Sequence, residues 1–246
     1  IYLDRKGKLY DPQNGVKDLK NKIVRFIGDP DERIQEDYLR IIRFLRFAIQ
    51  YDSSTDEGTI LALKLNLDGI KSLSKERILD ELIKILKLDN LDFILKHQNK
   101  RLIFSLIFPE LKNIDKISKL KHFKEKKEPL IQEDLILAIL LFDKTNNFEY
   151  FCHKYKVSNK LSKNLSLLFE NFNSSKSDSN FFKKNLLKNI YHFGIIEIKK
   201  IAILNFFDKL KMTIEELYEV LNKIDNVTIP ILSYDGNYLI EKGLSE

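Results

Sequence analysis

The stretch DPDERIQEDYLRIIRFLRFAIQ, at residues 29–50, decides the fold prediction for this chain. Asp29 suits a helix N-cap, Pro30 suits the first helical position, and Glu32 places an acid in the first turn. Apolar residues then recur at the spacing of one helix face, from Ile34 to Ile49. We therefore predict a helical segment over residues 33–47.

The same helical periodicity continues through most of the remaining chain. We expect helices over residues 59–67, 74–88, 91–97, 102–108, 135–142, 160–172, 180–193, 195–210 and 213–224. The Ser- and Asn-rich residues 171–180 predict a loop. With only 8 glycines and 5 prolines, the composition also favours helices over an all-β design.

The β-like patterns are confined to the first 28 residues. Ile1-Tyr2-Leu3 and Lys8-Leu9-Tyr10 flank a polar turn and predict a hairpin, and residues 23–26 predict a third short strand. Three short strands cannot form an independent core. The chain also opens in a strand pattern without an initiator Met, so we expect further residues upstream.

Composition bounds the partners and the location. Lys and Arg number 42 against 36 Asp and Glu, and the net charge of +6 permits an anionic partner without establishing one. The single cysteine, Cys152, excludes a disulfide framework and predicts a cytoplasmic location. The longest apolar run, residues 135–142, is far shorter than the roughly 20 residues that span a bilayer, so we expect no membrane partner.

Glu36, Asp37 and Arg40 form the constellation that points to chemistry. On a helix, residues three and four apart share a face, so these three side chains would lie together. An isolated set of this kind is usually an ion pair worth about 0.2–0.5 kcal/mol. Here Arg33 and Arg43 add more guanidinium groups than the two carboxylates can use, and Arg is suited to bidentate recognition of phosphates and bases.

The motifs around this constellation resemble those of a known family. Residues 23–30, followed by Arg33, Glu36-Asp37 and Arg40, look like the bacterial class II tRNA nucleotidyltransferases (CCA-adding enzymes) and the related poly(A) polymerases. Upstream, residues 11–19 resemble the family's D-P-x-G-G-x-x-D-L loop, with Asn14 where a first glycine is usual. Downstream, the S-x-E-R-x-x-x-E helix of the family's neck is matched by Ser74, Glu76, Arg77 and Glu81.

The resemblance implies a mainly α chain with a small α/β remnant. Residues 1–28 would be the remnant of a nucleotidyltransferase head, followed by an elongated all-helical neck (29–88), body (89–172) and tail (180–246). Residues 229–230 and 235–244 faintly resemble a family tail motif.

The resemblance also implies a nucleotide template made of Glu36, Asp37 and Arg40, with Arg33 and Arg43 in orientation or triphosphate binding. A carboxylate accepts hydrogen bonds and a guanidinium donates them. This pair matches the amino donor and ring-nitrogen acceptor of cytosine and adenine and opposes uracil and guanine. ATP and CTP are the implied substrates, and RNA, through the 3′ end of a tRNA, is the implied partner.

The carboxylates that would hold Mg²⁺ in this family are missing from the sequence. Nucleotidyl transfer needs metal ions clamped by carboxylates, which the family places in a D-x-D pair on a strand. The nearest pairs, Asp29 with Asp31 and Asp52 with Asp56, stand in the wrong context. We therefore assign no catalytic or metal-binding residue and expect activity only with a separate catalytic head fragment.

Several alternatives stay open. The lysines at 112–127 and 183–200 suit either a solvated face or contacts to RNA phosphates. The chain could also be a non-catalytic RNA-binding module or a decayed remnant, and its motifs do not separate CCA addition from poly(A) addition. The four histidines show no metal-binding spacing and no His–Asp dyad of the kind that would suggest a metal phosphohydrolase: His97, His122, His153 and His192.

Overall fold

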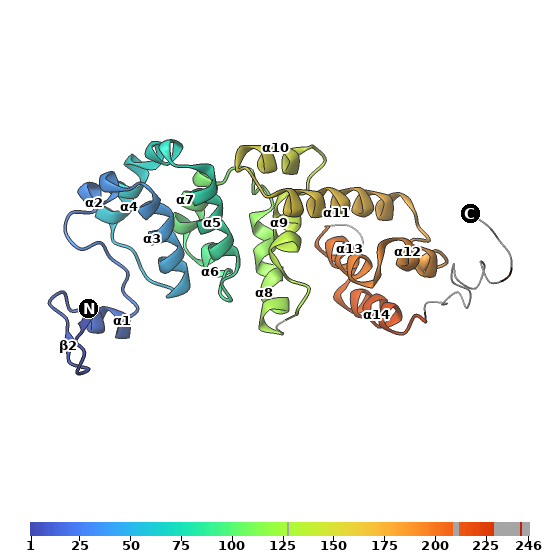
Figure 1. Ribbon diagram of the computed structural model, residues 1–246, viewed down its shortest axis with the longest axis horizontal. Helices are drawn as coiled ribbons and strands as arrows, with labels where there is room; N and C mark the ends of the chain where they lie inside the picture. Colours follow the sequence, from blue (N-terminus) through green and yellow to red (C-terminus); the bar gives the residue numbers. More distant parts are fainter. Residues whose placement is uncertain (127, 209–211, 229–241, 243–246) are drawn as a thin grey trace. The chain divides into compact units, whose positions relative to one another are not determined.

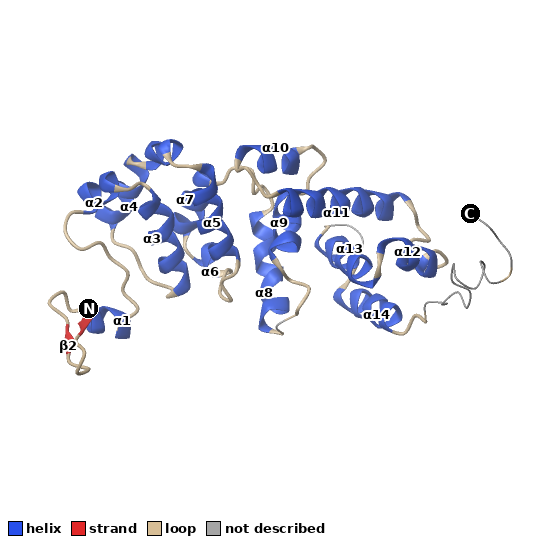
Figure 2. Cartoon of the chain, in the orientation of Figure 1, coloured by secondary structure: helices blue, strands red, loops and turns tan. Residues whose placement is uncertain are grey.

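The computed structural model describes residues 1–126, 128–208, 212–228 and 242 (Figure 1). It forms two compact units, Ile1–Glu170 and Asn171–Glu246. Helices dominate both units, and the strands are confined to the start of the chain (Figure 2). The predicted fold class, mainly α with a small β-containing remnant, is confirmed.

The first 28 residues fold into a hairpin and a short helix. Strand β1 (Tyr2–Leu3) pairs antiparallel with β2 (Leu9–Tyr10), which confirms the predicted hairpin, and α1 (Gly15–Lys20) follows. The third strand predicted at residues 23–26 is wrong. This segment instead contacts α3 (Leu39–Gln50) and the residues that follow it. Phe26 stacks on Phe44 of α3, and Val24 N–H donates to Ser53 Oγ (2.9 Å).

The decisive stretch forms two helices rather than the continuous one that we predicted. Helix α2 (Pro30–Glu36) begins at the expected N-cap, where Asp29 Oδ1 accepts from Glu32 N–H (3.0 Å). Asp37 is extended (φ −158°, ψ 105°), and α3 (Leu39–Gln50) begins after it. The break has a local cause, since Asp37 Oδ1 accepts from Leu39 N–H (3.1 Å) and offers the backbone an alternative to the helix.

The rest of the first unit is a succession of packed helices. Helix α3 packs on α5, and the two helices contribute the buried residues Ile42, Leu45, Ile49, Leu82 and Ile85, all at most 2 % exposed. No described helix is long and apolar enough to cross a membrane. The remaining elements are α4 (Glu57–Leu65), η1 (Leu67–Ser72), α5 (Lys75–Leu86), α6 (Phe93–Lys96), α7 (Gln98–Ile107), η2 (Ile114–Lys116), α8 (Ile117–Glu125), α9 (Glu133–Leu141), α10 (Asn147–Lys154) and α11 (Asn159–Ser177).

The second unit contains α12 (Leu186–Phe193), α13 (Ile195–Phe207) and α14 (Ile214–Asp225), around Ile190, Ile198 and Ile224. The loop predicted at 171–180 is wrong for residues 171–177, because α11 continues to Ser177 and the chain leaves the helix only at residue 178. At this end of α11, a polar side chain forms hydrogen bonds within the second unit: Ser175 Oγ donates to Phe172 O (2.7 Å) and accepts from the Asn205 amide (2.8 Å). Apart from residue 242, the tail motif at 229–230 and 235–244 lies outside the described residues.

Candidate nucleotide-binding site

Glu36 joins two arginines at the junction of α2 and α3. Its Oε1 accepts from Arg33 Nη1 (2.7 Å) and its Oε2 from Arg40 Nη1 (2.5 Å). Hydrogen bonds from Arg33 and then Arg40 lower the pKa of Glu36. Arg33 is also anchored by its Nε, which donates to Ile27 O (2.9 Å), and Arg40 Nη1 donates to Arg33 O (2.7 Å). Glu36 therefore fixes the positions of both guanidinium groups.

Asp37 pairs with a residue of α5 rather than with Arg40. Its Oδ2 accepts from Arg77 Nη2 (2.8 Å). Partial burial acts to raise the pKa of Asp37, but hydrogen bonds from Leu39 N–H and Arg77 outweigh it and lower that pKa. The shared helix face that we predicted is wrong for Asp37, since the break between α2 and α3 falls at this residue.

The side chains of Asp37 and Arg40 both keep hydrogen-bonding capacity. Among the described residues, no hydrogen bond joins these two side chains, and Arg40 uses only Nη1. Each oxygen of Asp37 has one partner, although a carboxylate oxygen can accept two hydrogen bonds. The two side chains are 31 % and 38 % exposed, so acceptor and donor positions are accessible to a ligand.

Glu81 of α5 holds two arginines of α3, Arg43 and Arg46. It is 1 % exposed and accepts from Arg46 Nε (2.9 Å), Lys84 Nζ (3.1 Å) and Arg43 Nε (3.3 Å). Burial acts to raise the pKa of Glu81, but hydrogen bonds from Lys84 and Arg46 outweigh it and lower that pKa. Arg43, which is half exposed, is thus held at its Nε.

The neck motif divides between this site and another surface. Ser74 caps α5, since its Oγ accepts from Arg77 N–H (3.4 Å), and Arg77 and Glu81 reach the α2–α3 region as described. Glu76 instead forms an exposed ion pair with Lys156 (3.3 Å). The sequence identified these residues by resemblance, but it gave no signal for the Arg77–Asp37 pair.

Residues 11–19, which match the family loop, form a turn that leads into α1, and carboxylates hold this segment. Asp11 accepts from the N–H groups of Gly15 (2.7 Å) and Val16 (2.8 Å), while Asp18 pairs with Arg25 (2.8 Å). Asn14 has φ +58°, in the left-handed region that favours glycine and that asparagine tolerates better than most residues. The backbone geometry therefore explains how Asn14 can occupy a glycine position.

A His–Asp pair that the sequence did not suggest connects α6 and α7 to the end of α3. Asp52, at φ +50°, lies with its Oδ1 3.0 Å from His97 Nε2, and Lys96 and Lys100 lie near the same carboxylate (3.7 and 3.9 Å). No sequence pattern indicated this pair, because the two residues are 45 positions apart and meet only in the fold. Two lysines rather than further acids surround the pair, so it does not resemble a metal site.

The acidic pairs weighed as metal ligands do not fit a catalytic magnesium site. Asp29 and Asp56 cap helices α2 and α4. Asp31 accepts from the side-chain amides of Gln35 and Asn66, and Asp52 is occupied by His97. Within the described parts of the chain, no three His, Cys, Asp or Glu side chains gather as a metal site would require.

Comparisons with known proteins cover most of the chain. Residues 55–115 match a family described as "Probable RNA and SrmB- binding site of polymerase A". A CCA-adding enzyme of Staphylococcus aureus (strain MRSA252) is 30 % identical over 203 residues, which are 82 % of this chain and 48 % of that enzyme. The human mitochondrial CCA tRNA nucleotidyltransferase 1 is 46 % identical over 89 residues, 35 % of this chain and 20 % of the relative.

A CCA-adding enzyme of Lactobacillus helveticus (strain DPC 4571) is 43 % identical over 85 residues, 35 % of this chain and 21 % of the relative. The chain thus spans about half or less of the length of the relatives that it matches.

Proposed function

This chain belongs to the family of CCA-adding enzymes and poly(A) polymerases, and from that premise we propose that it selects CTP and ATP at the α2–α3 junction. The observation that carries the proposal is that Asp37 and Arg40 bind different partners instead of each other, so that Asp37 keeps hydrogen-bond acceptors and Arg40 keeps donors. Cytosine and adenine each offer an amino donor beside a ring-nitrogen acceptor. Glu36 and Arg77 position the two reading groups, and Arg33 and Arg43 orient them or contact the triphosphate.

The proposed ligands also include RNA. The family match over residues 55–115 and the similarity to CCA-adding enzymes support binding of an RNA, with the 3′ end of a tRNA as the segment presented to the nucleotide. We place this function in the cytoplasm. The alternative function is that of a non-catalytic module, in which the chain would bind RNA through its basic helices without reading a nucleotide.

Nucleotidyl transfer itself requires groups that the described residues do not supply. Since their acids do not form a magnesium site, we propose that a separate catalytic head provides the metal-binding carboxylates. This chain would then be inactive alone and would contribute nucleotide selection and RNA binding to the assembled enzyme.

Nucleotide selection is tested by equilibrium binding of the four ribonucleoside triphosphates to the full chain. CTP and ATP should bind more tightly than UTP and GTP by about 1–3 kcal/mol, the discrimination of one bidentate contact. Asp37→Asn should reduce this preference, because an amide offers a donor as well as an acceptor. Equal affinity for all four nucleotides would refute the template.

Arg77→Gln is the matched control for that variant. It removes a partner of Asp37 but leaves both reading groups in place. We expect it to weaken the binding of all four nucleotides to a similar extent while the preference for CTP and ATP persists. A loss of preference as large as in Asp37→Asn would mean that disturbance of the junction, rather than base reading, explains both variants.

Catalysis and RNA binding are tested separately. The chain is mixed with a catalytic head fragment from a CCA-adding enzyme, Mg²⁺, tRNA lacking its CCA end and labelled CTP or ATP. Absence of incorporation at every mixing ratio would contradict complementation.

Filter binding of tRNA across a salt series tests the RNA-binding function, because the log of the affinity should fall linearly with the log of the salt concentration. A broad thermal transition without ligand binding would favour a decayed remnant.

A further inference from the structure

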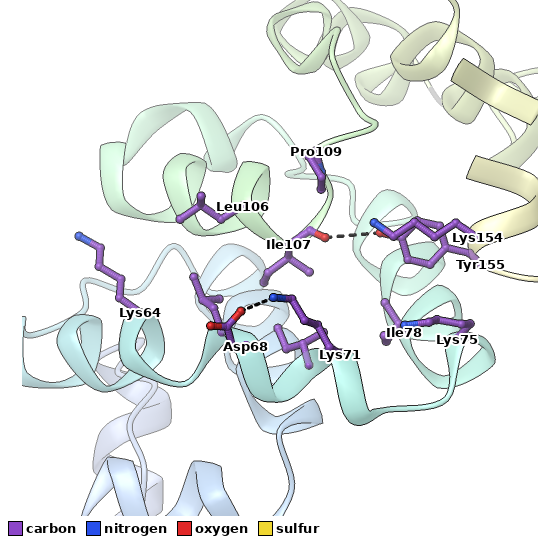
Figure 3. Close-up of a pocket in the computed structure, with 12 residues that line it drawn as sticks. Lys64, Asp68, Lys71, Lys75, Ile78, Leu106, Ile107, Pro109, Lys154 and Tyr155 are labelled. Atoms are coloured by element: carbon purple, nitrogen blue, oxygen red, sulfur yellow. Dashed lines mark hydrogen bonds and ion pairs between the residues drawn. The ribbon is translucent and has the colours of Figure 1, made fainter. Parts of the chain in front are cut away.

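A hollow of about 500 Å³ lies between η1, the start of α5 and the end of α7, in the first unit (Figure 3). Its inner surface is aliphatic and includes Ile70, Ile78 and Ile107. Tyr155 closes one side, but it is 2 % exposed, and its hydroxyl donates to Glu110 Oε2 (3.1 Å). The hollow is therefore an apolar depression that offers almost no aromatic face to a ligand.

Exposed leucines lie on α4 and α7, the helices that contribute Lys64 and Leu106 to the lining of the hollow. Helix α4 carries Leu61 and Leu65, which are 58 % and 71 % exposed, and α7 carries Leu102 and Leu106, which are 43 % and 54 % exposed. Each pair is four residues apart and so lies on one helix face. The two helices contact each other, and Leu106 also lines the hollow. Grouped exposed apolar side chains commonly mark an interaction site.

Lysines surround the same hollow. Lys64, Lys71, Lys75 and Lys154 line it, against a single aspartate, Asp68 (Figure 3). Within the described residues, neither Lys64 nor Lys75 belongs to an ion pair. Lys71 pairs with Asp68 (2.5 Å), but both side chains are more than 80 % exposed, and such a pair is easily exchanged for another carboxylate. The rim can therefore accept acidic groups.

The chemistry of this surface favours a protein segment over RNA. Proteins usually hold single-stranded RNA by stacking bases on exposed aromatic rings or on arginines. No arginine lines the hollow, and its one aromatic residue is buried. Aliphatic positions bordered by lysines match instead an amphipathic helix that presents apolar anchors every three or four residues and acids beside them.

We propose that the α4–α7 leucines and the adjoining hollow bind an acidic amphipathic helix of a partner protein. Apolar anchors of that helix would enter the hollow and cover the four leucines, while its carboxylates would meet Lys64 and Lys75. This docking surface is separate in chemistry from nucleotide selection at the α2–α3 junction, and its existence does not depend on that function.

The test uses a fluorescein-labelled synthetic peptide with leucines at helical spacing and glutamates beside them. A peptide of the same composition in scrambled order and a single-stranded uridine oligonucleotide are the comparison probes. Binding to the full chain is followed by fluorescence anisotropy and by NMR of the leucine methyl groups. We expect the patterned peptide to bind about ten-fold more tightly than the scrambled one and to shift methyl signals of Leu65 and Leu106.

Three variants make the result specific. Leu65→Glu and Leu106→Glu change exposed side chains, so the fold should persist, and each should weaken peptide binding by about ten-fold. Leu187→Glu, at a leucine of similar exposure (45 %) in the second unit, should leave binding unchanged. Equal binding of the two peptides, no methyl shift at the four leucines, or equal shifts caused by the RNA would overturn the proposal.

Discussion

Replacement of Glu81 by glutamine tests whether the buried carboxylate holds the arginines of α3 in place. Glu81 is 1 % exposed and accepts hydrogen bonds from three cations. Arg43 and Lys84 are 52 % and 45 % exposed, so water can solvate them once the charge is lost, whereas Arg46 is only 17 % exposed. Hydrogen bonds to charged groups contribute about 1.5–3 kcal/mol. Counting the Arg46 contact in full and the others as small, we expect Glu81→Gln to lower the free energy of unfolding by about 2–3 kcal/mol.

The assay is urea unfolding followed by far-UV circular dichroism, with the slope of the transition compared between variants. Glu76→Gln is the matched control, since Glu76 lies on the same helix but forms an exposed ion pair with Lys156, and it should leave the midpoint unchanged. A loss below about 0.5 kcal/mol in Glu81→Gln, the range of ordinary surface substitutions, would refute the reasoning.

Three further predictions concern pH, backbone conformation and packing. The pKa values of Asp37 and Glu81 are lowered, so their charged forms stabilise the fold fully above the ordinary carboxyl pKa of about 4. This contribution should disappear as the pH falls below about 4, and over those pH values the urea midpoint of the Glu81→Gln variant should depend less on pH than that of the unmodified chain. Asn14→Ala should destabilise the loop at 11–19 by about 1–2 kcal/mol, whereas Asn14→Gly should not, as measured by amide exchange of Val16. Ile42→Ala, at a fully buried position, should cost about 2–5 kcal/mol in urea unfolding.

Several features that depend on near neighbours in the chain were predictable. The cap at Asp29, the hairpin and the contacts of Glu36 with Arg33 and Arg40 all join residues within eight positions of each other. Spacing alone specifies such contacts, because residues three and four apart meet on a helix and a short turn pairs two strands. The resemblance added the neck motif, which the structure brings to the α2–α3 junction through Arg77 and Glu81.

Two kinds of feature were not predictable: contacts between residues far apart in the chain, and side-chain hydrogen bonds that end or extend a helix without changing its apolar period. The partner of Asp37 lies 40 positions away, and the partner of Asp52 lies 45 positions away. The break between α2 and α3 was missed because the apolar period runs through it without interruption, while its cause is a hydrogen bond from Leu39 N–H to the Asp37 side chain. Residues 171–177 were misjudged because their Ser and Asn side chains find partners within the second unit that no local pattern indicates.

The break that the sequence concealed is what makes the proposed template physically reasonable. In a continuous helix, Asp37 and Arg40 would be three positions apart and could satisfy each other, leaving fewer groups for a base edge. The extended backbone at Asp37 instead gives its carboxylate to Arg77, while Glu36 takes Arg40. Asp37 is thereby fixed by Arg77 and Arg40 by Glu36, so the two side chains do not pair with each other. Because Arg77 belongs to α5, the availability of Asp37 to a nucleotide depends on the same α3–α5 packing that Glu81 stabilises.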